Sequence, residues 1–275
     1  MVLVDIHCHL LPGIDDGSKN METSLKLARE AVEDGVTHAL MTPHTLNGQY
    51  LNHKKDVIKL TEQFQKRLKD ENIPLTVFPS QEVRLSGGLI QALDDDDILF
   101  CDEAGSYMLL EFPSEDVPHY SKNMIFELRK RGITPIIVHP ERNNRILKEP
   151  TLLQDFIEQG CLVQITASSY MGTFGKEIEK LSKRFIEAGQ CACFASDAHD
   201  LPNRQYQYSE ALQKLDEEFG KEKVEEFKNN ARAIINGDYV QLNWKPLKKR
   251  KNIFRFLKNV KPYRRAETKD SYYNT

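Results

Sequence analysis

Seven short apolar runs, rich in aliphatic and β-branched residues, recur along the chain, and most are separated by segments with helical spacing. The runs lie at residues 2–6, 38–41, 75–79, 107–111, 135–138, 162–165 and 192–195. Alternating strands and helices are typical of a mostly parallel sheet with helices packed outside it. Seven such units in one chain favour a closed or nearly closed α/β barrel. A doubly wound open sheet is the alternative that periodicity leaves open.

The helical segments between these runs have recognisable ends. Residues 21–34 repeat apolar side chains at helical spacing, and Gly35 follows where a C-terminal cap belongs. Residues 53–71 predict a polar helix with one apolar face, and a third helix, over 121–131, ends before Gly132. Further helices are expected within 151–159, 175–188, 208–219 and 222–236. A chain of 275 residues with this alternation suits a single barrel domain.

Charge is distributed unevenly along the chain. The formal net charge is −3, but residues 245–275 alone have a balance of +9, which leaves −12 for residues 1–244. This asymmetry predicts a barrel over 1–244 followed by a basic, flexible or amphipathic tail over 245–275. Residues 245–265 hold ten basic residues and no acid, with apolar residues interleaved, which suits an anionic membrane surface. A solubilising tail is the alternative, and nucleic-acid binding is not expected.

Cysteine usage and hydropathy indicate the compartment. No apolar run approaches the ~20 residues needed to span a bilayer, and no signal peptide is recognisable at the start. Five cysteines without a paired framework fit reduced thiols. We therefore expect a cytoplasmic protein. Cys191 and Cys193 form a CxC motif within an apolar run, and we interpret them as buried strand residues rather than metal ligands.

Six of the seven runs are followed by His, Asp or Glu at or just beyond their C-terminal ends. In chain order these are His7 and His9, the pair Asp15 and Asp16, His44, Glu82, Glu111, His139, and Asp197 with His199. The C-terminal ends of parallel strands converge on one face of an α/β barrel, where barrel enzymes hold their active sites. We therefore expect these side chains to meet at one site.

Imidazole and carboxylate groups together bind Zn²⁺, Mn²⁺ or Fe²⁺. His7 and His9 are two residues apart, so an extended backbone points both rings to the same side. With one of the two aspartates, the nine candidates exceed what one ion needs, and two or three divalent ions sharing a carboxylate are expected. Such a cluster activates water and clamps the oxygens of a phosphoryl transfer. The sequence therefore predicts a metal-dependent phosphate-ester hydrolase.

The remaining histidines and the cysteines do not fit this pattern. His38 lies inside its run, His53 begins a helix, and His119 is expected at the surface. A cysteine-based phosphatase would carry Arg six residues after its nucleophile, and none of the five cysteines is followed by Arg at that spacing. Thiolate catalysis of that kind is excluded.

The order HxH, D, H, E, E, H and DxH resembles the PHP (polymerase and histidinol phosphatase) family over about residues 1–240. The segments DIHCHLLPGIDDGS, TPH, QEVR, HPER and SDAH resemble bacterial manganese-dependent tyrosine phosphatases of capsule and exopolysaccharide loci. The resemblance implies a distorted (β/α)7 barrel and hydrolysis of phosphotyrosine by a metal-bridging hydroxide. It also implies a substrate, the tyrosine-rich tail of a membrane-associated bacterial kinase, and so a location at the inner face of the membrane.

Carried over position by position, the resemblance implies three metal sites, with Mn²⁺ as the expected ion and Fe²⁺, Co²⁺ or Zn²⁺ as alternatives. The first site comprises His7, His9, Glu82 and Asp197; the second comprises Glu82 as a bridge with Glu111 and His139; the third comprises Asp16, His44 and His199. The choice of Asp16 over Asp15 follows the family pattern.

Two arginines are expected to bind the phosphate. Arg142 lies in HPER and Arg204 lies five residues after His199. A guanidinium group suits oxyanions because it donates two parallel hydrogen bonds. With Asp197 and His199, these arginines form the implied catalytic set.

Three rival functions share parts of this pattern. Histidinol phosphatase, or another small-molecule phosphoesterase, would use the same metal ligands. An amidohydrolase also carries HxH after its first strand, but a lysine usually bridges its metals, where this chain has Glu82. A non-catalytic metal-binding module typically loses ligands, whereas the set here is complete.

Overall fold

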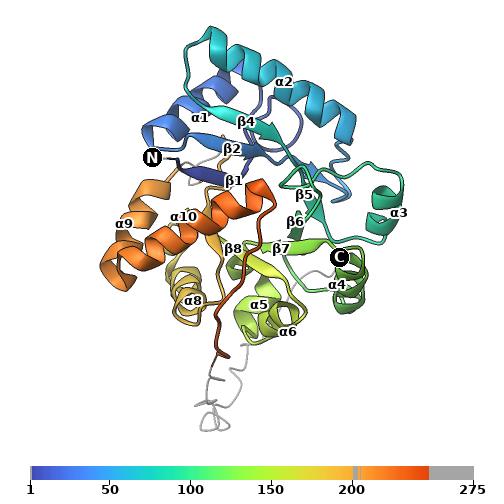
Figure 1. Ribbon diagram of the computed structural model, residues 1–275, viewed down its shortest axis with the longest axis vertical. Helices are drawn as coiled ribbons and strands as arrows, with labels where there is room; N and C mark the ends of the chain where they lie inside the picture. The colour runs from blue at the N-terminus through green and yellow to red at the C-terminus, as the bar shows by residue number, and fades with distance from the viewer. Residues whose placement is uncertain (1, 201–203, 205, 248–275) are drawn as a thin grey trace, which may run out of the picture.

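Every strand pairing in the described part of the chain is parallel. The computed structural model describes residues 2–200, 204 and 206–247. Its strands surround a common axis, with helices outside them (Figure 1). They are β1 (Val4–Cys8), β2 (His38–Met41), β3 (His44–Thr45), β4 (Thr76–Pro79), β5 (Glu82–Arg84), β6 (Tyr107–Glu111), β7 (Thr134–Val138), β8 (Leu162–Thr166) and β9 (Cys193–Ala195).

Two of the seven predicted strands, 38–41 and 75–79, continue beyond a bend as further short strands, β3 and β5, that were not predicted. The pairing orders are β1-β2-β4 and β3-β5-β6-β7-β8-β9. Only two residues separate β2 from β3, and two separate β4 from β5. Backbone bonds join the broken strands at their bends, because Ser80 N donates to Met41 O (2.9 Å) and Glu82 N donates to Pro43 O (3.1 Å). Each bent pair therefore acts as one strand of the barrel.

The barrel closes between β9 and β1. Asp197 N donates to His7 O (2.8 Å), and His9 N donates to Ala198 O (3.0 Å). These bonds lie just after β9 and join the β9 edge of one sheet to the β1 edge of the other. The predicted closed barrel of seven parallel strands is therefore confirmed, and the open-sheet alternative is wrong.

Seven helices agree with their predicted bounds to within one residue. They are α1 (Met21–Glu33), α2 (Lys54–Asp70), α4 (Ser121–Lys130), α6 (Leu152–Glu158), α8 (Lys176–Glu187), α9 (Tyr208–Phe219) and α10 (Lys221–Asn236). The short elements α3 (Leu89–Asp94), α5 (Asn144–Lys148), α7 (Ala167–Met171) and the 3-10 helix η1 (Pro140–Arg142) were not predicted. None exceeds six residues, which is too short for a helical period to be recognised.

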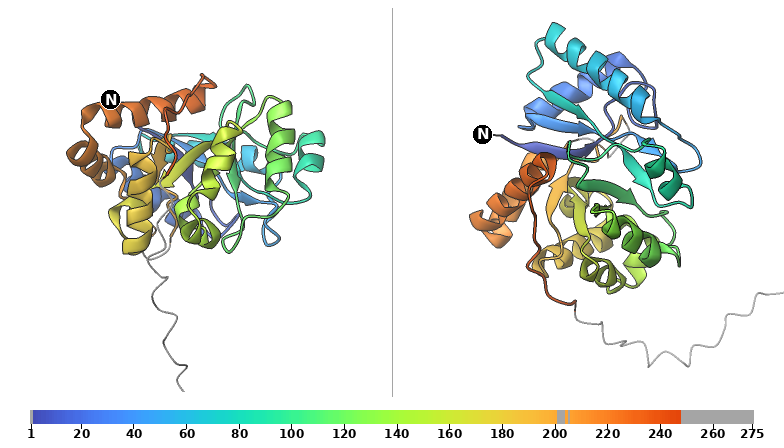
Figure 2. Two further views of the ribbon diagram at one scale, coloured as in Figure 1. Left: turned by 90° about the horizontal axis from the view of Figure 1, so that it is seen from below. Right: turned by 45° about the vertical axis from the view of Figure 1, so that its right-hand side comes forward.

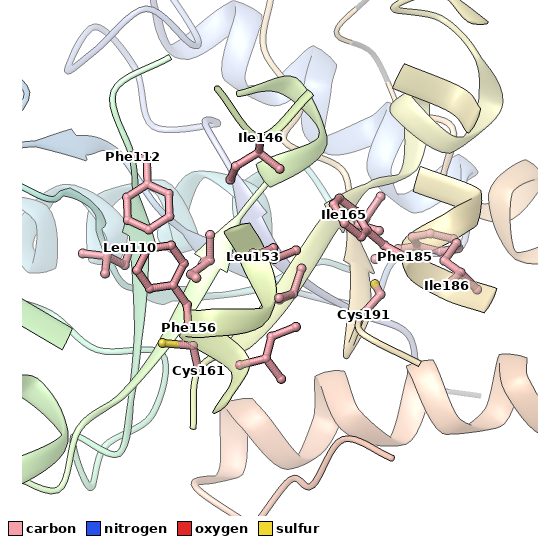
Figure 3. Close-up of a cluster of buried hydrophobic side chains, with 14 of the residues drawn as sticks. Leu110, Phe112, Ile146, Leu153, Phe156, Cys161, Ile165, Phe185, Ile186 and Cys191 are labelled. Carbon is pink, nitrogen blue, oxygen red and sulfur yellow. The ribbon is translucent and has the colours of Figure 1, made fainter. Parts of the chain in front are cut away.

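The core fills the space between the strands and the outer helices. Residues alternate along β6 and β7, so that Leu109 and Ile136 share the face of Glu111, whereas Leu110 and Ile137 pack outward. Phe156 of α6 and Phe185 of α8 cover this outward face, and Figure 3 shows the cluster they form with Leu110, Phe112, Ile146, Leu153 and Ile165. Both faces of these strands are therefore buried, as parallel sheets require.

Helices cover the barrel on all sides in the three views (Figures 1 and 2). The helices α1 and α2 lie beside β1, β2 and β4, and α10 contacts β1 and β9. Cys191 and Cys193 are buried and carry free thiols, so the interpretation of the CxC motif as packing is confirmed. No helix among the described residues is long and apolar enough to cross a membrane.

A strap formed by residues 237–247 lies across the end of the barrel where the strands begin. The Tyr107 hydroxyl donates to Asp238 O (2.7 Å), and Lys245 N donates to Ala188 O (2.8 Å). Gly189 has a φ of +68°, and a Cβ there would lie 2.2 Å from Asn243 O, so the strap requires glycine at this position. Residues 245–247 of the predicted tail belong to this strap. The rest of the tail lies outside the described residues.

Replacement of Tyr208 by Phe should lower the free energy of unfolding by about 1–2 kcal/mol. The Tyr208 ring is buried, and its hydroxyl lies 2.9 Å from Phe194 O and 3.2 Å from Val4 O, so it links α9 to both strands at the closure. Urea denaturation of the chelator-treated protein measures the change. Tyr239→Phe is the control, because Tyr239 is 83% exposed. Equal changes in both variants would contradict this role of the Tyr208 hydroxyl.

Candidate metal centre

The nine predicted metal ligands lie together at the end of the barrel where the strands finish. The bends after β2 and β4 place two of these ligands. They begin β3 at His44 and β5 at Glu82, and these two residues are direct partners in the strand register. Glu111 ends β6, while His139 and Asp197 follow β7 and β9. All nine side chains fall within four groups whose ligand atoms lie within 4.8 Å of one another.

His7 and His9 present their Nε2 atoms to the same point. The Nδ1 of His7 lies 3.1 Å from Gln164 Oε1, and the Nδ1 of His9 lies 2.7 Å from Asp15 Oδ2. Both partners are acceptors, so each Nδ1 carries the ring hydrogen. When both rings are neutral, each Nε2 atom carries a lone pair, yet the two Nε2 atoms are only 3.1 Å apart. A cation between them removes this repulsion.

Two carboxylates converge on the same point. Glu82 Oε2 lies 3.4 Å from His7 Nε2 and 3.3 Å from His9 Nε2, and Asp197 Oδ1 lies 3.5 and 3.4 Å from them. Both oxygens are buried and accept no hydrogen bond within the described chain. Ligands bound about 2.1 Å from one ion at angles of 90–110° are about 3.0–3.4 Å apart. The spacing therefore fits a shared divalent cation.

The surroundings of His9 favour positive charge. Burial by itself lowers the pKa of His9, but Asp15, together with Asp197 and Glu82, outweighs burial and raises the pKa well above its usual value. In the metal-free protein, a proton on His9 Nε2 supplies this positive charge. A bound metal ion would replace that proton.

A second group forms around His44 on the solvent side. His44 Nε2 lies 3.4 Å from Asp16 Oδ1, and His199 Nε2 lies 3.6 Å from the same oxygen. The Nδ1 of His199 donates to Asp197 O (2.9 Å), so its Nε2 carries the lone pair, and Arg204 Nη2 lies 3.3 Å from that nitrogen. The structure therefore brings together the three side chains of the third implied site. Asp16 faces these rings, whereas Asp15 lies behind His9.

Glu82 lies between the remaining candidates. Its Oε1 is 2.8 Å from His139 Nε2, and its Oε2 is 2.8 Å from His44 Nδ1. Glu111 Oε2 is 3.8 Å from the same His44 nitrogen, so Glu111 lies on the His44 side of Glu82 and His139 on the other. A carboxylate with neighbours on both sides is suited to bridge two ions. This arrangement fits the bridging role that the resemblance implied, but Glu111 and His139 fall in different ligand groups, so the predicted second site of Glu82, Glu111 and His139 is not found as one group among the described residues.

Burial sets the protonation of the outer ligands. It lowers the pKa of His139 to about 3, with help from the positive charge of Arg142. Burial also lowers the pKa of His199 to about 4, and the charge of His9 adds to the shift. Both rings are therefore neutral at pH 7 and offer lone pairs. Burial raises the pKa of Glu111 to about 7, and the neighbouring charge of Glu82 contributes; a bound cation would oppose both effects.

Strained backbone occurs at two of the ligands. His139 has a φ of +35° and Asp197 a φ of +50°, in the left-handed region that non-glycine residues seldom occupy. Such conformations typically cost about 1–3 kcal/mol and persist where the surroundings fix them. Each occurs where a strand ends, and each turns a ligand toward the centre. Gly17 shows a related constraint, since a Cβ there would lie 2.2 Å from His9 O.

Three supporting residues were not assigned from the sequence. Gln164 orients His7, Asp15 orients His9, and Arg84 Nε donates to Glu111 Oε2 at 2.7 Å. Partners of this kind fix the ring tautomer and strengthen a metal site. A signal existed for Gln164, the only polar residue in its apolar run at 162–165. Its strand was the one that supplied no His, Asp or Glu.

The two predicted arginines flank the centre. Arg142 and Arg204 both donate to Asp197 Oδ2, Arg204 at 2.8 Å. The guanidinium of Arg142 also lies over the Phe174 ring, 5.3 Å from its centroid. The Nε atoms of both arginines are buried without a partner among the described residues. Each arginine therefore keeps donors available for an anionic ligand.

A cavity of about 320 Å³ opens above the ligands. It is lined by Asp16, His44, Glu111, His139 and Asp197, by the arginines 84, 142 and 204, and by Asn47, Gln49, Tyr50, Phe112, Ser114, Val138, Pro140 and Asn143. The histidines set aside earlier lie elsewhere: His53 pairs with Asp97, His38 stacks on Phe78, and His119 is exposed as expected.

Comparisons with known proteins agree with this site. Residues 3–236 match the model of the family described as capsular polysaccharide synthesis, CpsB/CapC. The chain is 38% identical to the tyrosine-protein phosphatase YwqE of Bacillus subtilis over 255 residues, which cover 93% of this chain and all of YwqE. It is 34% identical to CapC of Staphylococcus aureus over 253 residues, which cover 88% of this chain and 98% of CapC.

A solved structure agrees as well. The fold matches a chain from the crystal structures of YwqE from Bacillus subtilis and CpsB from Streptococcus pneumoniae, which are described as unique metal-dependent tyrosine phosphatases. The TM-score is 0.86 at 38% identity, covering 90% of this chain and 100% of the other. The resemblance inferred from the motifs is thereby confirmed.

Glu82→Gln should remove at least one metal ion per chain, because Glu82 belongs to two of the ligand groups and Gln lacks its charge. Wild-type protein loaded with Mn²⁺ and dialysed should retain two or three ions, counted by plasma mass spectrometry. Glu103→Gln is the control, since Glu103 is an exposed acid in the loop before β6, at the opposite end of the barrel. Equal metal content in all three proteins would contradict the bridging position of Glu82.

Proposed function

The chain belongs to the CpsB/CapC family of capsular polysaccharide synthesis, and from this premise we propose that it is a metal-dependent protein-tyrosine phosphatase. The reaction is hydrolysis of a phosphate monoester. The nine ligands described above hold two or three divalent ions, and Mn²⁺ is the proposed native metal. When bound, these ions supply an activated water and neutralise charge on the phosphoryl oxygens.

The observation that supports this function most directly is the buried pair of Nε2 atoms beside two unpartnered carboxylate oxygens. His7 Nε2 and His9 Nε2 lie 3.1 Å apart in the buried centre, behind Asp197, and Asp197 lines a cavity that Arg142 and Arg204 also line. A binding site for several cations, directly beneath guanidinium groups, is complementary to a phosphate dianion. An amide or a lactone carries no such charge.

Arg142 and Arg204 are proposed to hold the phosphoryl group. Both already donate to Asp197 Oδ2, so Asp197 fixes their position while its other oxygen, Oδ1, faces the metal ligands. Burial by itself raises the pKa of Asp197. The charges of Arg142 and Arg204, with contributions from His7 and His9, outweigh burial and hold the pKa well below its usual value. Asp197 thus stays ionised and links the phosphate-binding groups to the metal centre.

The proposed substrate is a phosphotyrosine protein, and the finer proposal is the tyrosine-rich tail of a membrane-associated bacterial kinase. The family supports the first statement through the names of the relatives. The resemblance stated for the motifs supports the second. A basic segment at 248–265 would hold the protein at an anionic membrane surface, close to such a substrate.

Chelator-treated protein should regain hydrolysis of a phosphotyrosine peptide when Mn²⁺ is added. Arg142→Lys should lower kcat/KM by about 100-fold, because Lys cannot donate two parallel hydrogen bonds to the phosphate. Arg145→Lys, on an exposed Arg paired with Glu149, is the matched control and should not change kcat/KM. Phosphate release measures kcat/KM for the wild type and both variants.

Histidinol phosphate serves as the competing substrate in the same assay. A higher kcat/KM on histidinol phosphate than on the peptide would keep the metal site and replace the proposed function with a small-molecule phosphatase. Hydrolysis of neither substrate by metal-loaded protein would contradict both, and a non-catalytic binding module would remain.

Deletion of residues 248–275 should abolish binding to vesicles that contain phosphatidylglycerol. The cut follows Leu247 because Lys245 is bonded to Ala188 and Gln190, so the strap stays intact. Co-sedimentation compares the full chain and the shortened chain on anionic and on zwitterionic vesicles. Full retention of anionic-vesicle binding by the shortened chain would contradict the proposed role of the tail.

A further inference from the structure

Most of the cavity above the metal ligands is polar, and among the described residues two Phe or Tyr side chains line it. They are Tyr50 and Phe112. Phe112 is 5% exposed and packs against Phe156 in the core, with the ring centroids 5.2 Å apart. Most of its surface is therefore already covered. Tyr50 belongs to none of the core clusters of the described residues, so its ring is available to a ligand.

The loop that carries Tyr50 is fixed to the metal centre. Asn47 Oδ1 accepts from the backbone N–H groups of Gln49 (3.0 Å) and Tyr50 (2.7 Å), which closes the turn. Asn52 Nδ2 donates to His44 O (2.8 Å) and to Ile14 O (3.0 Å).

Gln81 Nε2 then donates to Asn52 O at 2.6 Å, which ties the loop to the bend between β4 and β5. The position of Tyr50 is therefore set by the same bends that place His44 and Glu82.

The Tyr50 ring also has a defined orientation. It is parallel to the His44 ring, with an interplanar angle of 9° and centroids 6.2 Å apart. The ring is partly buried and stands at the wall of the cavity, beside a candidate metal ligand. A phosphate bound at the arginines would carry its ester group past this wall.

We propose that Tyr50 is a specificity-determining residue that contacts the phenol ring of the substrate and so favours aryl over alkyl phosphates. This inference rests on the proposed phosphatase function. A phenol ring would find in Tyr50 an uncovered aromatic partner on a braced loop. Aromatic contacts in offset or edge-on geometry favour ring-bearing ligands by roughly 3- to 10-fold. A seryl or glycerol phosphate lacks the ring to make this contact.

The test compares a ring-bearing and a ringless phosphonate that cannot be hydrolysed. Phenylphosphonate and methylphosphonate are titrated by calorimetry into the full chain loaded with Mn²⁺. In Tyr50→Ala the ratio of the two Kd values should shift by about 3- to 10-fold against phenylphosphonate. Tyr50→Phe should keep the wild-type ratio. Leu51→Ala is the matched control, since Leu51 is 58% exposed, follows Tyr50 in the loop and does not line the cavity.

An unchanged ratio in Tyr50→Ala, or an equal loss of affinity for both phosphonates, would overturn the proposal. An equal loss would indicate a disturbed metal centre, which metal content would reveal separately. Failure of the proposed function has a different signature: wild-type protein would bind both phosphonates yet fail to hydrolyse the phosphotyrosine peptide. If wild-type protein binds neither phosphonate, both the function and the role of Tyr50 are contradicted.

Discussion

The approach of His7 Nε2 to His9 Nε2 is the contact on which the rest of the site depends. Gln164 and Asp15 take the ring hydrogens, so two lone pairs face each other at 3.1 Å in a buried centre. The oxygens of Glu82 and Asp197 that face this point accept no well-aligned hydrogen bond among the described residues, although His44 Nδ1 lies 2.8 Å from Glu82 Oε2. Repulsion among like groups is tolerated in a folded protein only if a cation compensates it, because unpaired buried charge is costly. The centre therefore requires positive charge, which a proton on His9 supplies in the metal-free protein and the proposed metal ions would supply when bound.

Departures from regular barrel geometry place the ligands around this contact. The bends that break β2 from β3 and β4 from β5 turn His44 and Glu82 toward the centre, and closure between β1 and β9 sets Asp197 against His7. At Asp197 and His139 the backbone adopts positive φ, which the surrounding hydrogen bonds must hold. The opposite end of the barrel is closed by the 237–247 strap and carries none of the candidate ligands. Stability and chemistry are thus separated between the two ends, as is common in α/β barrels.

Much of this could be predicted from the sequence, for physical reasons. Strands buried on both faces read as continuous apolar runs, and a metal ligand must stand where a strand ends, so His7, Glu111 and Asp197 were recognisable. The bends were not, because two residues between β2 and β3 leave no periodic signal. The role of Gln164 depends on a contact with His7 157 residues away, and that of Asp15 on the way its loop folds back onto His9; spacing along the chain encodes neither. Tyr50 was missed for the same reason, since only the folded loop places it beside His44.

The nine side chains at this end of the barrel are proposed to hold a cluster of divalent ions. Anomalous diffraction at the manganese edge from crystals grown with Mn²⁺ tests it most directly. Two or three peaks are predicted, one between His7, His9 and Asp197 and a second beside Glu82, toward His139 or Glu111. A third, if present, should lie between Asp16, His44 and His199. No peak at this end of the barrel, or a single ion bound away from the His7–His9 pair, would contradict the claim.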